Sequence, residues 1–87
     1  MILIKKITDL DGNEKLSHDY LERKGCICKP CFMKIGIPML LEYFKDSNKL
    51  PKFGYLKTAT VVDIKQNRDE TIVRTLNSIY HLQKVED

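Results

Sequence analysis

Two runs of β-branched residues, joined by four polar residues, occupy the second half of the chain. The first run is Thr58–Ile64, the connection is Gln66–Asp69, and the second run begins at Thr71. β-branched side chains favour extended backbone, and two such runs around a short polar connection are typical of an antiparallel hairpin. We expect the second arm to continue to Leu82, with a bulge at Asn77–Ser78 where the alternation loosens. The pattern therefore predicts a hairpin as the basis of the fold.

The first half of the chain adds two strands and one short helix. Ile2–Thr8 is rich in β-branched residues and leads into an Asp-Gly turn, and Met39–Phe44 is a compact apolar run between turn residues. Between them, Ser17 can cap a helix of about two turns over His18–Lys24, and Gly25 suits the left-handed position after its end. The sequence thus predicts a mainly β fold, a meander sheet with one short helix.

The chain length allows one small domain. With 87 residues, 43% hydrophobic and 31% charged, the composition is that of a globular protein, and we expect a single domain over residues 1–87. No apolar run approaches the roughly 20 residues of a membrane-spanning helix, and the opening residues do not resemble a signal peptide. Three cysteines cannot all pair within one chain. We therefore expect a cytoplasmic protein, in a reducing compartment, with no membrane partner.

The core of such a small domain is thin, because a chain of this length buries only about 60–65% of its unfolded surface. Apolar residues of the expected strands and helix are the candidates for it. We expect the core to contain Ile4, Leu21, Leu41, Val62, Ile64, Ile72, Leu76 and Tyr80.

The last third of the chain carries a short signature. It starts with Thr58-Ala59-Thr60-Val61-Val62 and continues, after the polar connection, with Val73-x-Thr75-x-Asn77-Ser78-x-Tyr80. This signature resembles one found in small uncharacterised proteins of phages and low-GC bacteria that fold as SH3-like β-barrels. The resemblance implies a small SH3-like barrel of phage or low-GC bacterial origin, and it implies no catalytic residues.

The three cysteines at positions 26, 28 and 31 are the one cluster of side chains in the sequence that suggests metal binding or redox chemistry. If Cys26 and Cys28 lie in an extended segment, both thiols point to one face and behave as small buried hydrophobes, with no metal or other cofactor. The alternative is zinc, because Cys28-x-x-Cys31 has a chelating spacing and Cys26 adds a third thiolate. The fourth zinc ligand would then be His18, with His81 as the other imidazole in the chain.

A third interpretation of the cysteines is redox chemistry. Cys28-Lys29-Pro30-Cys31 matches the Cys-x-Pro-Cys of thioredoxin-like sites, where a helix N-terminus lowers the pKa of the first thiol. That site needs a buried strand directly before the motif, and a charged segment, Glu22–Gly25, precedes it here.

The sequence contains no catalytic motif such as G-x-S-x-G or H-E-x-x-H, so we expect no enzymatic activity. We expect instead a binding module that engages a host protein or sequesters a small ligand, for example as an inhibitor of a host enzyme or defence system. Arg74, Asn77 and Tyr80 are the candidate binding residues, lining a groove on the barrel. The simpler alternative is a structural role for Thr75, Asn77, Ser78 and Tyr80. In it the Asn and Ser side chains satisfy backbone groups at the bulge, and Tyr80 packs its ring while its hydroxyl finds a partner.

Two other functions are compatible with the sequence. A small barrel can bind single-stranded nucleic acid on an aromatic surface with a basic rim. The candidates for such a surface are Tyr43, Phe44, Phe53, Tyr55 and Tyr80 with Lys45, Lys49, Lys52 and Lys57, unless the aromatic residues belong to the core. The net charge of +3 is mild and its lysines are interspersed, which is not typical of a dedicated nucleic-acid binder. The other alternative is a zinc-stabilised structural domain, and an exposed strand edge would allow a homodimer.

Overall fold

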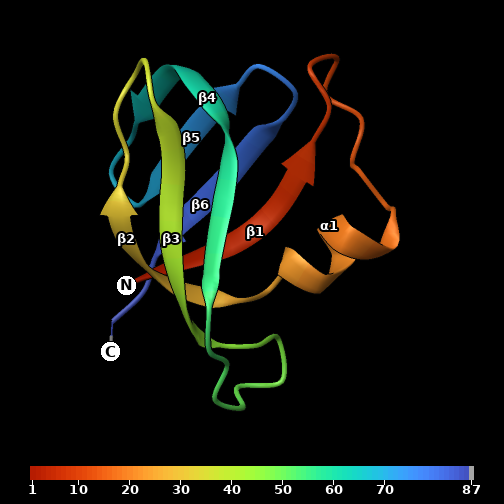
Figure 1. Ribbon diagram of the computed structural model, residues 1–87, viewed down its shortest axis with the longest axis vertical. Helices are drawn as coiled ribbons and strands as arrows, with labels where there is room; N and C mark the ends of the chain where they lie inside the picture. Colours follow the sequence, from red (N-terminus) through yellow and green to blue (C-terminus); the bar gives the residue numbers. More distant parts are fainter. Residues whose placement is uncertain (87) are drawn as a thin grey trace.

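Six strands form the closed antiparallel barrel of the computed structural model, which describes residues 1–86 (Figure 1). Each strand pairs with the next along the chain, and the last pairs with the first. The mainly β class with one short helix is confirmed, and the sheet closes into an arrangement that fits a small SH3-like barrel. In order, the elements are β1 (Ile2–Thr8), α1 (His18–Arg23), β2 (Ile27–Phe32), β3 (Pro38–Lys45), β4 (Tyr55–Gln66), β5 (Glu70–Thr75) and β6 (Ile79–Lys84).

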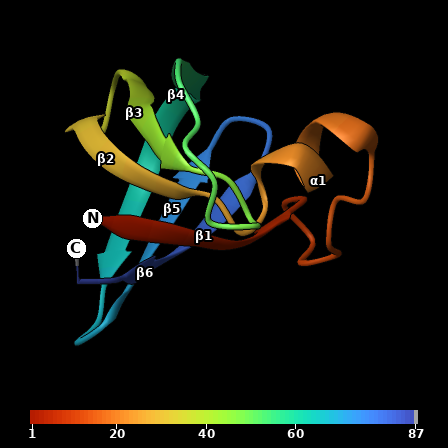
Figure 2. The ribbon, with the colours of Figure 1, turned by 90° about the horizontal axis from the view of Figure 1, so that it is seen from below.

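The short helix α1 lies beside the barrel, at the side of β1 (Figure 2). Ser17 occupies the N-cap with extended backbone, although its side chain makes no capping hydrogen bond. Gly25 has a φ of +84° directly after the helix, and a Cβ there would lie 2.8 Å from the Cβ of Ser47, so both conformation and space require glycine. Within residues 1–86, no helix is long and apolar enough to cross a membrane.

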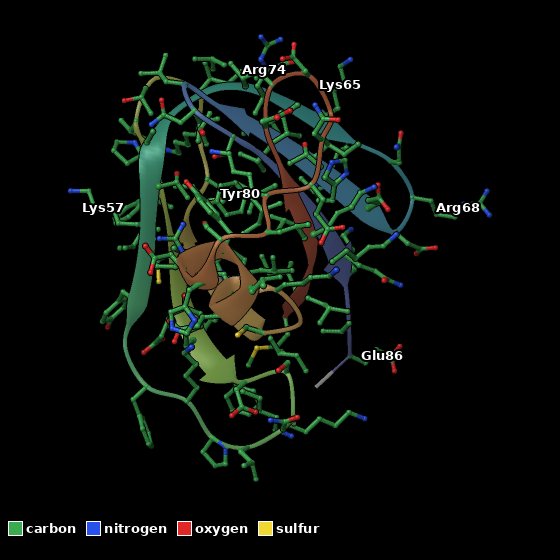
Figure 3. All side chains as sticks on the ribbon, turned by 90° about the vertical axis from the view of Figure 1, so that its right-hand side faces the viewer. Lys57, Lys65, Arg68, Arg74, Tyr80 and Glu86 are labelled. Atoms are coloured by element: carbon green, nitrogen blue, oxygen red, sulfur yellow. The ribbon has the colours of Figure 1, made fainter. Side chains whose placement is uncertain are left out.

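The predicted hairpin is present but its second arm is not one strand. β4 and β5 pair from Gln66 with Thr71 to Val61 with Thr75, so the polar tip lies where the sequence placed it, and Arg68 projects from it (Figure 3). The prediction of a continuous strand to Leu82 is wrong, because the chain reverses after Thr75 and returns as β6. The Oγ1 of Thr75 accepts a hydrogen bond from the Ser78 backbone N–H at 3.1 Å and donates one to the Ser78 carbonyl at 3.1 Å. The residues expected to form a bulge therefore form a tight turn.

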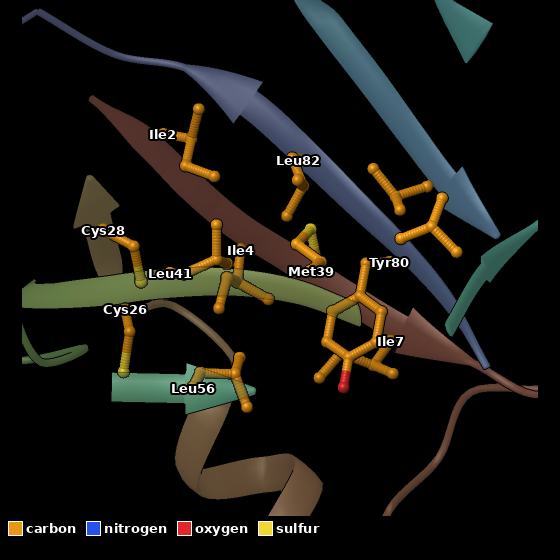
Figure 4. Close-up of a cluster of buried hydrophobic side chains, with 12 residues drawn as sticks. Ile2, Ile4, Ile7, Cys26, Cys28, Met39, Leu41, Leu56, Tyr80 and Leu82 are labelled. Carbon is orange, nitrogen blue, oxygen red and sulfur yellow. The ribbon is translucent and has the colours of Figure 1, made fainter. Parts of the chain in front are cut away.

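The barrel interior is filled by side chains from all six strands and from the segment just before β2 (Figure 4). Three predicted core residues, Ile4, Leu41 and Tyr80, are buried, and Ile64 is partly buried against the core. Ile72 is also partly buried. The buried hydrophobic core consists of Ile2, Ile4, Ile7, Cys26, Cys28, Met39, Leu41, Leu56, Val61, Val73, Tyr80 and Leu82.

Three predicted core residues are wrong: Leu21, Val62 and Leu76 are 46%, 41% and 59% exposed. The pairing of β4 with β5 shifts register between Val61 and Asp63, so Val61 faces the interior and Val62 does not. An extra residue in one strand interrupts the alternation of inner and outer side chains. Leu76 is exposed because it lies in the β5–β6 turn, and Leu21 because α1 buries none of its residues.

Candidate functional site

Cys26 and Cys28 both point into the core, as expected for an extended segment that leads into β2 (Figure 4). The Sγ of Cys26 donates to the carbonyl of Glu22 at 3.2 Å. Burial raises the pKa of the Cys28 thiol to about 12, and burial also raises the pKa of Cys26. Both thiols therefore stay protonated near neutral pH and act as small apolar core residues.

The proposed zinc ligands do not come together. Cys31 is exposed, whereas the other two thiols are inside the barrel. The side chain of His18 is 84% exposed, and its Nε2 lies 2.9 Å from Oε1 of Glu22. In the part of the chain that the structure describes, no three His, Cys, Asp or Glu side chains are grouped so that they could hold a metal ion.

The geometry that the redox interpretation needs is also different. Cys28 and Cys31 both lie on β2 rather than at a helix N-terminus, one buried and the other exposed. The pKa of Cys28 is shifted upward by burial, the opposite of the shift that activates a thioredoxin-like cysteine.

The candidate binding residues Arg74, Asn77 and Tyr80 are not on a common surface. Tyr80 is 2% exposed and points into the barrel, whereas Arg74 is exposed on β5 (Figures 3 and 4). Asn77 is exposed in the β5–β6 turn, where its carbonyl accepts a hydrogen bond from Nζ of Lys15 at 3.0 Å. The structure therefore brings none of the three together in a groove.

Tyr80 belongs instead to a polar network that connects α1 with β6. The Nη1 of Arg23 donates to the Tyr80 hydroxyl at 3.0 Å, and the Arg23 guanidinium lies 5.0 Å from the ring centre of Tyr20. Nζ of Lys15 donates to the Tyr20 hydroxyl at 3.3 Å and to Oγ of Ser78 at 2.7 Å. These contacts give the buried hydroxyl a charged donor and attach the short helix to the barrel.

An apolar groove lies on the outer face of β2, β3 and β4. It has a volume of about 480 Å³ and is lined by Phe32, Ile37, Pro38, Leu40 and Lys57. We call this site the apolar groove. The strand register places Phe32 and Lys57 on either side of Leu40. Phe32 is 55% exposed, so its ring is available to a partner. The sequence does not predict this groove, because the outer position of these residues depends on the register of three strands.

A second hollow of about 280 Å³ lies at the end of β3. Phe44, Phe53, Lys29 and Lys52 are among its lining residues, and we call it the aromatic hollow. Phe53 is 89% exposed and Phe44 44%. Nζ of Lys52 lies 4.4 Å from the ring centre of Tyr43. Aromatic rings and ammonium groups are thus close together in this hollow.

The aromatic residues considered for nucleic-acid binding divide into two groups. Tyr80 is in the core and Tyr43 packs against it, half-buried, whereas Phe44, Phe53 and Tyr55 are exposed. Among the lysines considered with them, two are half-buried and two are exposed. The alternative in which the aromatic residues are core residues therefore describes Tyr80 and not the exposed three.

Comparison of the chain with protein-family models, curated proteins and solved structures gives no significant match.

Proposed function

We propose that the protein is a small non-enzymatic binding module, encoded by a phage, that engages a host protein through the apolar groove. Inhibition of a host enzyme or defence system is the activity that such a contact would serve. The observation that carries the proposal is the exposed apolar groove around Phe32 and Leu40. A partner that covers these apolar side chains removes them from water, which lowers the free energy of the complex.

The composition of the groove favours a protein partner. Four of its five lining residues are apolar, one aromatic and three aliphatic, and the fifth is Lys57. Interfaces typically combine such an apolar centre with a polar rim, and a few aromatic anchors carry most of their binding energy. Phe32 is the anchor we expect to matter most, because it is the most exposed of the apolar groove residues.

The state of the cysteines supports binding rather than catalysis. Cys26 and Cys28 are buried with raised pKa values, which keeps these thiols from acting as nucleophiles at neutral pH.

The proposal is tested by capture of partners from a lysate of a low-GC bacterium with tagged protein. We expect the amount of one specific captured protein to fall at least tenfold with Phe32→Ser, because the variant removes the apolar anchor. Leu16→Ser is the matched control: Leu16 is 65% exposed, lies before α1 and does not line the groove. Thermal melting of both variants checks that they fold.

Equal capture by the wild type, Phe32→Ser and Leu16→Ser would contradict the proposal. If no captured protein depends on Phe32, the protein-partner hypothesis is wrong, and a small molecule in the groove becomes the next candidate.

A further inference from the structure

We propose that the aromatic hollow is a separate site for single-stranded nucleic acid, a function beyond the protein contact at the apolar groove. Phe44 on β3 and Phe53 in the loop before β4 line the same hollow from two segments. Exposed rings of this kind provide faces on which unpaired bases stack, independently of base sequence.

The two rings are outside the core for a structural reason. Tyr43 and Phe44 are neighbours on β3, and successive side chains of a strand point to opposite faces. Tyr43 packs against the core, so Phe44 is on the outer face. Phe53 follows Pro51 and Lys52, whose backbone N–H donates to the Phe44 carbonyl at 3.1 Å, and this contact holds the loop beside β3.

The cations around the hollow match a phosphate backbone. Lys29 and Lys52 line it, and Nζ of Lys45 lies 5.3 Å from the Phe44 ring centre. Lysine ammonium groups are point charges on flexible side chains. Such charges can neutralise the phosphates of a nucleic-acid strand without reading its bases. The acidic residue of the same hollow is Glu42, so the positive charges outnumber the negative ones.

Asp46, the acidic residue next to this region in the β3–β4 loop, is already engaged. Its Oδ1 accepts hydrogen bonds from the backbone N–H groups of Asn48 and Leu50 at 2.8 and 3.0 Å. These bonds tie its carboxylate to the backbone of the loop.

A polar hollow adjoins the aromatic hollow on the side of α1. It has a volume of about 400 Å³ and shares Tyr43 and Lys52 with the aromatic hollow. Tyr55, Lys57 and Arg23 line it as well, so another exposed ring and two more cations follow the first pair of rings. Asp19 and Glu22 on α1 also line it, and their carboxylates repel phosphates and limit the length of the strand that fits. The two hollows therefore suit a short single strand of a few nucleotides.

The aromatic hollow shares no lining residue with the apolar groove, whereas Lys57 lines both the groove and the polar hollow, so the test variants are made at Phe32, Phe44 and Phe53 and not at Lys57. Leu40 in the groove and Phe44 in the hollow are four residues apart on β3, which corresponds to about 14 Å along a strand. Variants at the two places therefore report on different ligands.

The test uses fluorescence anisotropy of labelled dT12 and rU12 with the full chain at 50 mM salt. We expect Phe44→Ala and Phe53→Ala each to weaken binding about 5- to 150-fold, because each removes one stacking surface. Phe32→Ala is the matched control: it removes an exposed phenyl ring from the apolar groove and is expected to change binding less than twofold.

Salt and charge variants test the phosphate contacts. If three lysines each neutralise one phosphate, a rise from 50 to 200 mM salt weakens binding roughly 20-fold. Lys52→Gln is expected to make this dependence shallower. Lys65→Gln is the control, because Lys65 is exposed near the other end of β4, away from the hollow.

Several results would overturn the inference. These are no binding of dT12 or rU12 by the folded wild type at 50 mM salt, equal weakening by Phe32→Ala and Phe44→Ala, tighter binding of a duplex, and binding of inorganic polyphosphate as tight as that of dT12. Capture of a protein that depends on Phe44, without oligonucleotide binding, would assign the hollow to a protein and also overturn it. Loss of protein capture in Phe32→Ser with intact dT12 binding would leave this inference standing, so the two proposals fail separately.

Discussion

The wall of the barrel formed by β2, β3 and the first half of β4 exposes large apolar side chains beside its lysines, whereas the exposed side chains of the wall formed by β5, β6 and β1 are all charged. Phe32 and Phe44 are exposed on the first wall. On the second, Lys5 and Arg74 are exposed, and Nζ of Lys5 lies 2.9 Å from Oε2 of Glu70. The inner faces of both walls contribute apolar side chains to one core.

The difference between the walls shows where the molecule departs from what stability alone requires. An antiparallel sheet with one face on the core normally presents a polar face to water. The second wall follows this rule and the first does not. Exposed apolar patches of this kind typically mark interaction sites, which is why both proposals concern the first wall.

The largest expected effect separates the inner from the outer face of the first wall. Leu41→Ala should lower the free energy of unfolding by about 2–5 kcal/mol, because Leu41 is fully buried and a cavity remains. Leu40→Ala, one residue earlier on the outer face, should cost about 1 kcal/mol or less. Urea unfolding measures both. Equal losses would contradict the assignment of the two faces.

The next effect separates a buried from an exposed cysteine on the first wall. Burial raises the pKa of Cys28 to about 12, whereas the thiol of an unfolded chain ionises near 8.5–9. Above about pH 9 the unfolded chain therefore loses a proton that the folded chain keeps, and the free energy of unfolding falls as the pH rises towards 12. Below about pH 9 this contribution is fully present.

Urea unfolding between pH 8 and 10.5 should show this fall, and Cys28→Ala should flatten it, whereas Cys31→Ala should not. Burial also raises the pKa of Tyr43 to about 12, which adds a fall of the same sign above about pH 10. A thiol reagent at pH 8 should modify Cys31 quickly and the two buried cysteines only after unfolding. Rapid modification of Cys28 in the native state would refute the buried assignment.

The smallest effect concerns the second wall. Lys5 lowers the pKa of Glu70, so the pair contributes stability above the usual pKa of a glutamate and loses it as the pH falls through the lowered value. The difference in melting temperature between the wild type and Glu70→Gln should therefore shrink between pH 6 and pH 3. Glu86→Gln serves as the control on an exposed glutamate near the C-terminus. A difference that grows on acidification would contradict the ion pair.

Strands and turns that depend on local signals could be predicted. β1 has the predicted bounds, Ile2–Thr8, and β3 extends the predicted run Met39–Phe44 by one residue at each end. Gly25 takes the left-handed conformation expected after α1. Propensity and turn chemistry act between neighbours in the chain, which is why the sequence indicates them.

The candidate site was predicted only in part. The inward orientation of Cys26 and Cys28 followed from their spacing, and the exposed Phe44 and Phe53 were named among the aromatic residues of a possible nucleic-acid surface. The groove around Phe32 was missed. Its residues come from β2, β3 and β4, and no local pattern reports which of three strands lie side by side.

By itself the sequence determined a mainly β chain with one short helix, because β-branched runs, an Asp-Gly turn and a glycine after the helix act locally. Only the tertiary structure decided which apolar residues became core. A shift in register beside Val62 moved this side chain outward, since side chains alternate with a period of two and one extra residue exchanges the faces. Closure of β6 onto β1 then enclosed an interior that a few side chains fill, and Phe44 and Phe53 remained outside it.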